Sequence, residues 1–424
     1  MATKAAESFS SYSGQFSNQT LPIIAFGDAL KALRKKMGAT RFTKNKNFAG
    51  VATTLGAQVP IPFVGRIGVT DVTPGVSPTA ATALANQTRY LLLDKWKTSL
   101  PFALNGEELG IFQLNSIVPR ALERATQAIA ESVEQTIVDL AYAFPAVTGT
   151  PGVGCFATAI TPLNDLYVAM SNNLCPAGED VALFLRTTDV GALKNLDDYK
   201  KNPQLAGLDR AEKQYGAALL TSMLGYELFE NQFIKVRLPG TYTGTTTMAA
   251  AAAIGALSIS VTVAAGTWTM KAGDVLRLVA SDAPGGFQFV SVAADVTIAS
   301  TTGTVTITQP LEFATLISSA VTSIVTDTEG YSPYENFAIT PDAIAIGNRV
   351  LRVGDLAERL GLAWDVTDDD DVANGYHGTG LTFTLKNEPG SNQESYRVQL
   401  YYGATWNDTR LGGRLLSGGT AIGS

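Results

Sequence analysis

The side chains best suited to chemistry in this sequence are one histidine, two cysteines and a run of four aspartates. His377 lies in the glycine-containing stretch Asn374-Gly-Tyr-His-Gly. Because the chain has a single histidine, one subunit cannot supply a two-histidine metal site, and a Ser-His-Asp triad would have to use this one loop residue. We therefore expect His377 to be a surface residue without a catalytic role.

The acidic run consists of four consecutive residues, with a fifth carboxylate, Asp365, nearby. Its members are Asp368, Asp369, Asp370 and Asp371. Carboxylate oxygens suit divalent cations, but this run lacks the alternating spacing and the closing glutamate of an EF-hand loop. A solvated acidic loop is the first interpretation, and a loop that pairs with a basic patch on a neighbouring subunit is the second. A metal-dependent hydrolase site built on the run is a third.

The two cysteines and the glycines offer little further chemistry. Cys155 and Cys175 are not spaced as a CxxC pair, so we expect two reduced thiols and neither a disulfide framework nor a metal cluster. The sequence has no GxxxxGK[ST] phosphate loop and no GxSxG nucleophile elbow. These absences predict a protein that is not an enzyme and that uses no cofactor.

The distribution of charge is uneven. Only 16% of the residues are charged, against about 25% in an average soluble protein, so we infer that much of the surface is hidden against other chains. Residues 1–50 carry a formal charge of +6 and, since the whole chain carries −7, the remainder carries −13. The basic residues Lys31, Arg34, Lys35 and Lys36 end a predicted helix at 21–37. They form either a solvated helix end or a contact with an acidic partner or DNA.

Targeting signals are missing from the sequence. The first residues, Met-Ala-Thr-Lys-Ala-Ala-Glu-Ser, lack the apolar core of a signal peptide. No stretch of roughly 18 uncharged apolar residues is present. We therefore expect no membrane contact, and a protein that is made and kept in the cytoplasm or leaves it only by cell lysis.

The strongest helical pattern covers residues 116–144. Apolar residues recur there at steps of three or four, which predicts one continuous buried stripe on a helix roughly 40 Å long. The stripe consists of Leu122, Ala125, Ile129, Val133, Ile137, Leu140 and Phe144. Other segments predict short strands within 51–98, a helix at 163–171, a strand at 180–185 and a helix from Thr188 or Asp189. They further predict a mostly helical 204–224, a strand at 225–236 and a mixed pattern at 336–351.

A change in composition marks residues 241–309. This stretch holds fourteen threonines and only five charged residues: Lys271, Asp274, Arg277, Asp282 and Asp295. Short β-type runs are expected at 258–263, 274–280, 287–292, 296–299 and 304–308, separated by turn signals. The pattern predicts an all-β barrel or sandwich inserted into an otherwise mixed chain. Strands are again expected at 381–385 and 396–402, with a loose tail at 417–424. The aromatic residues Tyr396, Tyr401, Tyr402 and Trp406 are expected to pack, with base stacking as the alternative.

Several segments, taken in order, resemble the major capsid (coat) proteins of tailed double-stranded DNA bacteriophages. The opening segment is Phe102-Ala-Leu-Asn-Gly-Glu-Glu-Leu, followed by the long helix. The central segments are Asp180-Val-Ala-Leu-Phe-Leu-Arg-Thr-Thr-Asp and Gly225-Tyr-Glu-Leu-Phe-Glu-Asn-Gln-Phe-Ile-Lys. The closing segments are Asn336-Phe-Ala-Ile-Thr-Pro-Asp-Ala-Ile and Arg397-Val-Gln-Leu-Tyr-Tyr-Gly-Ala-Thr-Trp. The predicted β-insertion is similar to that of the short-tailed branch, whose coat proteins carry an inserted β-barrel.

The resemblance implies an α+β architecture, the tailed-phage capsid fold known as Hong Kong ninety-seven. It divides the chain into an N-terminal arm (1–50), an extended β-loop (51–100) and a peripheral domain with a spine helix (101–160). An axial domain (161–240), an inserted all-β domain (241–325) and the remainder of the axial and peripheral domains (326–424) follow. In this interpretation the spine-helix core is Leu122, Ile129, Val133, Ile137 and Leu140.

The same resemblance implies a structural function in the virion. The chain would self-assemble in the host cytoplasm into pentamers and hexamers of an icosahedral head around double-stranded DNA. Implied partners are further copies of the chain, a scaffolding protein, a portal, DNA contacted without sequence preference and, in some phages, a decoration protein. The basic residues Lys31, Arg34, Lys35 and Lys36 are the expected scaffold contact, and the run Asp368 to Asp371 is the candidate intersubunit loop. Alternatives are a bacterial nanocompartment shell protein of the same fold, a decoration or fibre protein, and a metal-dependent hydrolase.

Overall fold

The computed structural model describes residues 38–47, 58–64, 86–104, 120–176, 180–196, 219–323, 331–349, 363–367, 381–389 and 394–421. The chain divides into two compact units. One consists of Met1–Val59, Leu91–Thr136 and Ala345–Ala404, and the other of Pro60–Tyr90, Ile137–Ile344 and Thr405–Ser424. Each unit is therefore assembled from segments that are far apart in the sequence.

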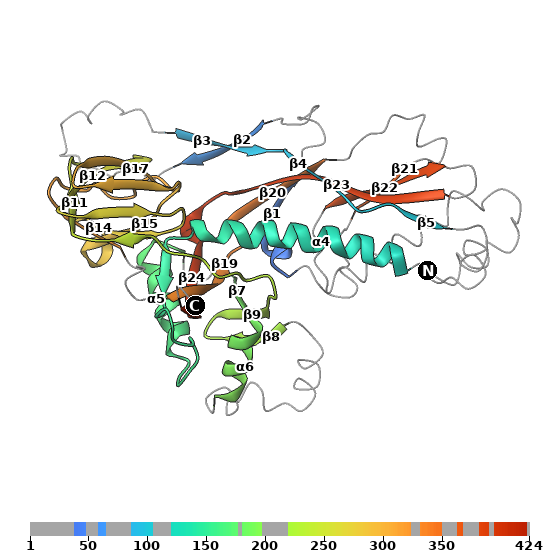
Figure 1. Ribbon diagram of the computed structural model, residues 1–424, viewed down its shortest axis with the longest axis horizontal. Coiled ribbons are helices and arrows are strands. Elements are labelled where there is room, and N and C mark those ends of the chain that lie inside the picture. Colours follow the sequence, from blue (N-terminus) through green and yellow to red (C-terminus); the bar gives the residue numbers. More distant parts are fainter. Residues whose placement is uncertain are drawn as a thin grey trace, which may run out of the picture. The chain divides into compact units, whose positions relative to one another are not determined.

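The first unit is built on a seven-stranded sheet (Figure 1). Its main path is β1 (Lys44–Asn47), β20 (Ile344–Arg349), β23 (Glu394–Trp406), β22 (Thr382–Pro389) and β21 (Ala363–Thr367). The short strands β4 (Lys95–Thr98) and β5 (Phe102–Leu104) also pair with β23. The antiparallel registers align Asp365, Thr384, Gln399 and Thr98 in one row. Strands β21, β22, β23 and β4 are therefore adjacent in this order, with β21 and β4 on the two outer sides.

The helix predicted for 116–144 is present as α4 (Arg120–Leu140), followed by a 3-10 turn at Ala141–Ala143. Leu122, Ile129, Val133 and Ile137 are buried, whereas Leu140 is partly exposed. Within the first unit, the Thr136 hydroxyl lies 2.9 Å from the Tyr402 hydroxyl. The described helix is roughly 32 Å long. It ends before the predicted residue 144 because the chain tightens into the 3-10 turn before Pro145, and residues 116–119 lie outside the described residues.

The second unit contains a six-stranded mixed sheet (Figure 1). Its order is β6 (Ala146–Thr148), β24 (Gly412–Ala421), β19 (Tyr331–Ile339), β7 (Val181–Leu185), β9 (Tyr226–Glu230) and β8 (Leu219–Met223). Helix α5 (Thr161–Asn172) packs Leu163, Leu166 and Met170 against this sheet, and α6 (Thr187–Asn195) contributes Val190 and Leu193 to the same core. Strand β7 is buried on both faces, as a central strand requires. The ring of Phe184 stacks on Phe229 and Phe337 at centroid distances of 5.3 and 5.0 Å.

The same unit contains an all-β module of strands β10 to β18 between residues 241 and 323 (Figure 1). Its larger sheet has the order β15 (Phe287–Ser291), β14 (Val275–Val279), β18 (Ala320–Ser323), β11 (Thr245–Met248), β12 (Ser258–Ala264) and β17 (Thr302–Thr306). A bridge between Val292 and Ile307 brings its two ends together, so the sheet closes into a barrel. A smaller sheet contains β10 (Thr241–Tyr242), β13 (Thr267–Met270) and β16 (Val296–Ala299). Alternating apolar residues such as Ile259, Val261 and Val263 fill one shared core.

Several sequence predictions fail locally. Residues 204–224 were expected to be mostly helical. Residues 204–218 lie outside the described residues, and the end of the segment is not helical, because Leu219–Met223 forms β8, which pairs with β9 through a turn at Leu224 and Gly225. The strand expected at 225–236 ends at Glu230. Residues 336–351 contain no helix in their described part, which consists of the end of β19, a turn at 340–343 and β20. The loose tail expected at 417–424 is wrong up to Ala421, because β24 pairs along β19 and this pairing outweighs the Gly/Ser-rich composition.

Candidate functional site

The most developed polar site in the described residues is centred on Asp274, at the start of β14. The residue follows a turn in which Gly273 has φ +89°, and a Cβ there would lie 2.9 Å from the Cβ of Tyr142, so the turn requires glycine. The Asp274 side chain is fully buried. Its Oδ2 accepts hydrogen bonds from the backbone N–H of Lys271 (2.8 Å) and of Gly240 (3.1 Å), and from the Tyr242 hydroxyl.

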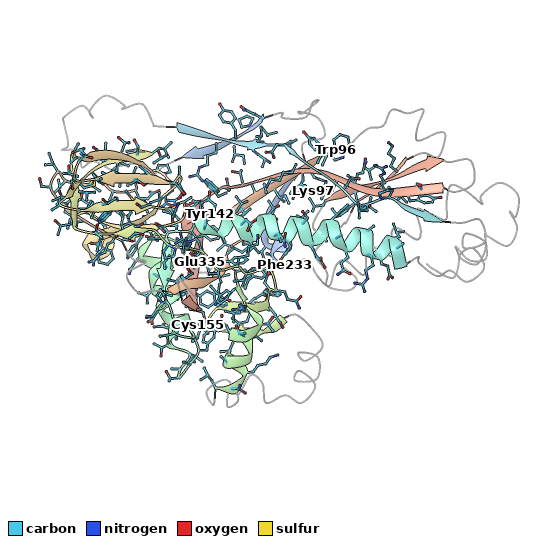
Figure 2. All side chains as sticks on the ribbon, in the orientation of Figure 1. Trp96, Lys97, Tyr142, Cys155, Phe233 and Glu335 are labelled. Atoms are coloured by element: carbon cyan, nitrogen blue, oxygen red, sulfur yellow. The ribbon has the colours of Figure 1, made fainter. Side chains whose placement is uncertain are left out.

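Two arginines and a glutamate connect Asp274 to the six-stranded sheet. Arg237 donates from Nη1 to Asp274 Oδ1 (2.7 Å) and from Nε to Glu335 Oε1 (2.6 Å). Arg414 on β24 donates from Nη1 to Glu335 (3.0 Å) and from Nε to the carbonyl of Phe144 (2.8 Å). We call Arg237, Asp274, Glu335 and Arg414 the module joint. Figure 2 labels Glu335, which is on β19.

The module joint balances two positive and two negative charges away from water. Burial opposes the ionised form of Glu335, but Arg237 and Arg414 outweigh it and hold the pKa of this carboxyl below its ordinary value. Burial likewise opposes the charged form of Arg237, yet Glu335 and Asp274 raise its pKa. Burial lowers the pKa of Arg414. A buried network of this kind depends on every partner, because removing one leaves an uncompensated charge.

A second set of polar contacts holds the module at Thr308 and Glu312. Arg89 donates from Nη2 to the carbonyl of Thr308 (2.8 Å) and from Nη1 to that of Asn407 (2.9 Å). Burial lowers the pKa of Arg89 to about 10, so this residue remains charged at neutral pH. Arg410 pairs with Asp408 (2.5 Å) and with Glu312 (3.2 Å). The barrel is therefore held by directional contacts at Asp274, at Thr308 and at Glu312.

The beginning of the described chain is held by Glu134 of α4. The buried Glu134 carboxylate accepts from the backbone N–H of Ala39 (2.8 Å) and of Thr40 (3.2 Å), and from the Thr40 hydroxyl (2.9 Å). Residues Ala39–Phe42 form a 3-10 turn, whose first N–H groups have no partner within the turn. This contact anchors Ala39 and Thr40 to α4.

Another buried polar cluster contains residue types that occur in catalytic sites. Asp189 accepts from the Ser417 hydroxyl (2.5 Å) and from the Asn336 side-chain amide (2.8 Å), and Cys155 is adjacent. Burial, followed by the charge of Asp189, raises the pKa of the Cys155 thiol far above neutrality. A thiol without appreciable thiolate is a poor nucleophile. The geometry therefore favours a structural polar cluster.

The residues singled out from the sequence have different outcomes. Lys31, Arg34, Lys35 and Lys36, the run Asp368 to Asp371, and His377 all lie outside the described residues. Tyr396, Tyr401 and Tyr402 are buried, so they are not available to stack on bases, whereas Trp406 packs edge-on against Tyr142. Both cysteines are free thiols. The module joint was missed, although Asp274 was one of five charges in a long uncharged stretch and thereby carried a signal.

Two further features are absent from the described part of the chain. It contains no group of three or more histidine, cysteine or acidic side chains arranged to hold a metal ion. None of its helices is long and apolar enough to cross a membrane.

Comparison with known proteins gives matches only at the level of structure. No protein-family model and no curated protein sequence matches the chain. A chain of Mycobacterium phage Che8 is 12% identical with a TM-score of 0.40, and the match covers 88% of each chain. A capsid chain of the cyanophage P-SCSP1u is 10% identical with a TM-score of 0.42, covering 91% of this chain and 90% of that one. A virus-like particle from Pyrococcus furiosus gives 9% identity and a TM-score of 0.36, covering 91% and 95%. TM-scores this low establish neither a shared fold nor a shared function.

Proposed function

We propose that this chain is the major capsid subunit of a tailed double-stranded DNA bacteriophage and assembles into pentamers and hexamers of an icosahedral head. The observation that carries the proposal is the order of elements along the chain. The long helix α4 is followed by the passage α5–β7–α6, a barrel inserted between β9 and β19, and the closing strands β22 to β24. This is the order that the resemblance in the sequence implies, including the inserted β-domain of the short-tailed branch.

The character of the surface also supports a role in self-association. Only 16% of the residues are charged, and several large apolar side chains are more than half exposed. They include Leu100, Leu238, Leu316 and Ile317. Scattered single apolar residues are normal on a surface, but adjacent pairs such as Leu316 and Ile317 are typical of protein contact sites. The proposed structural function uses such surfaces and needs no catalytic centre.

The basic segment is proposed as the contact with a scaffolding protein. Glu134 fixes Ala39 and Thr40 to α4, and Lys31, Arg34, Lys35 and Lys36 precede this point by only a few residues. Replacing these four residues by glutamine should abolish scaffold-dependent assembly while the subunit still folds, as measured by circular dichroism. Unchanged assembly of that variant would eliminate the scaffold contact.

Electron microscopy tests the proposal as a whole. The full chain is expressed alone and together with its neighbouring genes, and the particles are examined by negative stain. We expect closed icosahedral shells with the neighbouring genes and aberrant shells without them. A small soluble oligomer under both conditions would refute the proposal. Shells that enclose an enzyme in place of DNA would favour the nanocompartment alternative.

A further inference from the structure

The outer face of strands β14 and β15 carries aromatic rings where the outside of a barrel normally carries polar side chains (Figure 1). Alternate residues of β15 point into the barrel core, so Phe287 and Phe289 lie on its outer side, partly exposed. Their direct cross-strand partners on β14 are Val279 and Arg277, both exposed. Directly paired residues of an antiparallel sheet lie on the same face. These four side chains therefore form one surface, which we call the barrel face.

Arg277 is the charged centre of the barrel face. Its guanidinium lies over the ring of Phe287, with the carbon 4.0 Å from the ring centroid, and the Phe289 ring packs edge-on against Phe287 at 5.2 Å. A guanidinium that stacks through its flat side keeps its N–H edge available for a carboxylate. Within the described part of the chain, no carboxylate pairs with Arg277. The barrel face thus combines apolar area with a positive charge that has no acidic partner there.

Helix α5 has the opposite combination on its outward side. Tyr167 is 50% exposed and Val168 is 47% exposed. The helix has one charged residue, Asp165, which is exposed and forms no ion pair with any other described residue. Val168 is three residues after Asp165 and four after Asn164, and Tyr167 is three after Asn164, so these side chains are neighbours on one strip of the helix. We call this strip the α5 face.

The other exposed apolar side chains match the barrel face less well. Leu238 lies on a segment that also exposes Lys235, and Trp96 is next to the exposed Lys97. A lysine at either place would repel Arg277. Among the described helices, α5 is the only one with large exposed apolar side chains, and a helix is the element that commonly covers the open face of a sheet.

We propose that the barrel face of one copy of this chain packs against the α5 face of a second copy, with Arg277 donating to Asp165. This inference rests on the proposed self-association and names two surfaces that meet in it. A second copy suits a lone arginine, because the chain outside residues 1–50 carries a formal charge of −13. The two faces differ, so the contact is head-to-tail, and such contacts close into rings when the rotation between copies allows it. The ion pair sets the orientation, while the apolar side chains exclude water around it.

Charge reversal on each side tests the proposal with the full-length chain, expressed with its neighbouring genes. Arg277→Glu and Asp165→Arg each place like charges opposite each other, so the particle yield in sedimentation should fall about tenfold, which corresponds to about 1.4 kcal/mol. The chain with both substitutions again joins opposite charges and should regain most of the yield. A mixture of the two single variants should also form more particles than either alone, because contacts between unlike chains join opposite charges.

Matched controls separate the contact from net charge and from folding. Lys194→Glu on α6 and Glu123→Arg on α4 are exposed substitutions that change the net charge as much as Arg277→Glu and Asp165→Arg do. Both controls should assemble like the unmodified chain, and each variant should retain its circular dichroism spectrum. If Arg277→Glu alters the spectrum, Asp165→Arg against Glu123→Arg decides the question from the helix side.

The remaining outcomes separate this contact from the proposed function. Equal losses in the controls, or a double variant no better than the single variants, would show that the inference is wrong. Rescue in the double variant without rescue in the mixture would place the contact inside one chain, which also contradicts it. If the unmodified chain assembles and neither single variant is impaired, the inference fails while the proposed function stands. If the unmodified chain does not assemble, both fail.

Discussion

The substitution Asp274→Asn should destabilise the second unit far more than its size suggests. Asparagine has the shape of aspartate but has an NH2 group in place of one oxygen. In the better orientation this group replaces Oδ1, so the three hydrogen bonds to Oδ2 survive and the NH2 faces the Arg237 guanidinium. The loss is one charge-assisted hydrogen bond, about 1.5–3 kcal/mol, together with an unsatisfied buried donor, about 1–3 kcal/mol. We therefore expect a loss of about 3–5 kcal/mol, the range for breaking a buried ion pair.

Urea unfolding of the unassembled subunit measures this loss, followed by tryptophan fluorescence because Trp268 lies in the barrel core. The matched control is Asp295→Asn, which also removes a carboxylate that accepts from a lysine and a backbone N–H. Asp295 is 58% exposed, so its loss should cost less than about 1 kcal/mol. If Asp274→Asn shifted the unfolding midpoint no more than the control does, the interpretation of the module joint as a cooperative buried network would be refuted.

Three other predictions concern single groups. The pKa of Glu335 is lowered in the folded state, so ionised Glu335 stabilises the fold above the unfolded-state pKa, near 4.5, and this stabilisation is lost as the pH falls through the folded-state pKa. In Glu335→Gln, the free energy of unfolding measured with urea should therefore fall less steeply at acidic pH than in the unmodified chain. An unchanged pH dependence would contradict this. Glu134→Gln should speed hydrogen exchange at the amides of Ala39 and Thr40 by about tenfold or more, and continued protection there would show that Glu134 does not hold this segment. In the native subunit a thiol reagent should label Cys175 but not Cys155, whose pKa is raised by burial; fast labelling of Cys155 would exclude the buried polar cluster as described.

The barrel strands could be predicted from the sequence because their signal is local. Strand β12 alternates exposed and buried positions along Ser258–Ala264, and β16 has the bounds expected from its sequence. Strand β8 could not be predicted in this way, because its short apolar run fits a helix as well as a strand. The turn that pairs it with β9 has Leu224 at φ +52°, where asparagine or glycine would have given a recognisable signal.

The candidate site was much harder to predict than the fold. Arg237 and Arg414 are 177 positions apart in the sequence, and they meet only because Glu335 on β19 lies beside β24. Asp274 was interpreted only as the start of a short strand at 274–280. Its fourfold hydrogen bonding depends on the chain returning at Gly240 and Tyr242, and no local pattern encodes that return. A lone carboxylate in a nearly uncharged stretch was the only sequence signal available.

The choice of ions for the module joint is itself informative. Apolar residues of similar volume often stabilise a buried site as well as an ion pair does, so stability alone does not account for four charges of which two, Asp274 and Arg414, are fully buried and two are largely buried. An arginine fork, however, imposes direction, because the Arg237 Nε and Nη1 groups must reach Glu335 and Asp274 at the same time. An apolar contact tolerates small rotations of one body on another. The barrel is held by both Arg237 and Arg89, so its exposed Leu316 and Ile317 are presented in a single orientation relative to the six-stranded sheet.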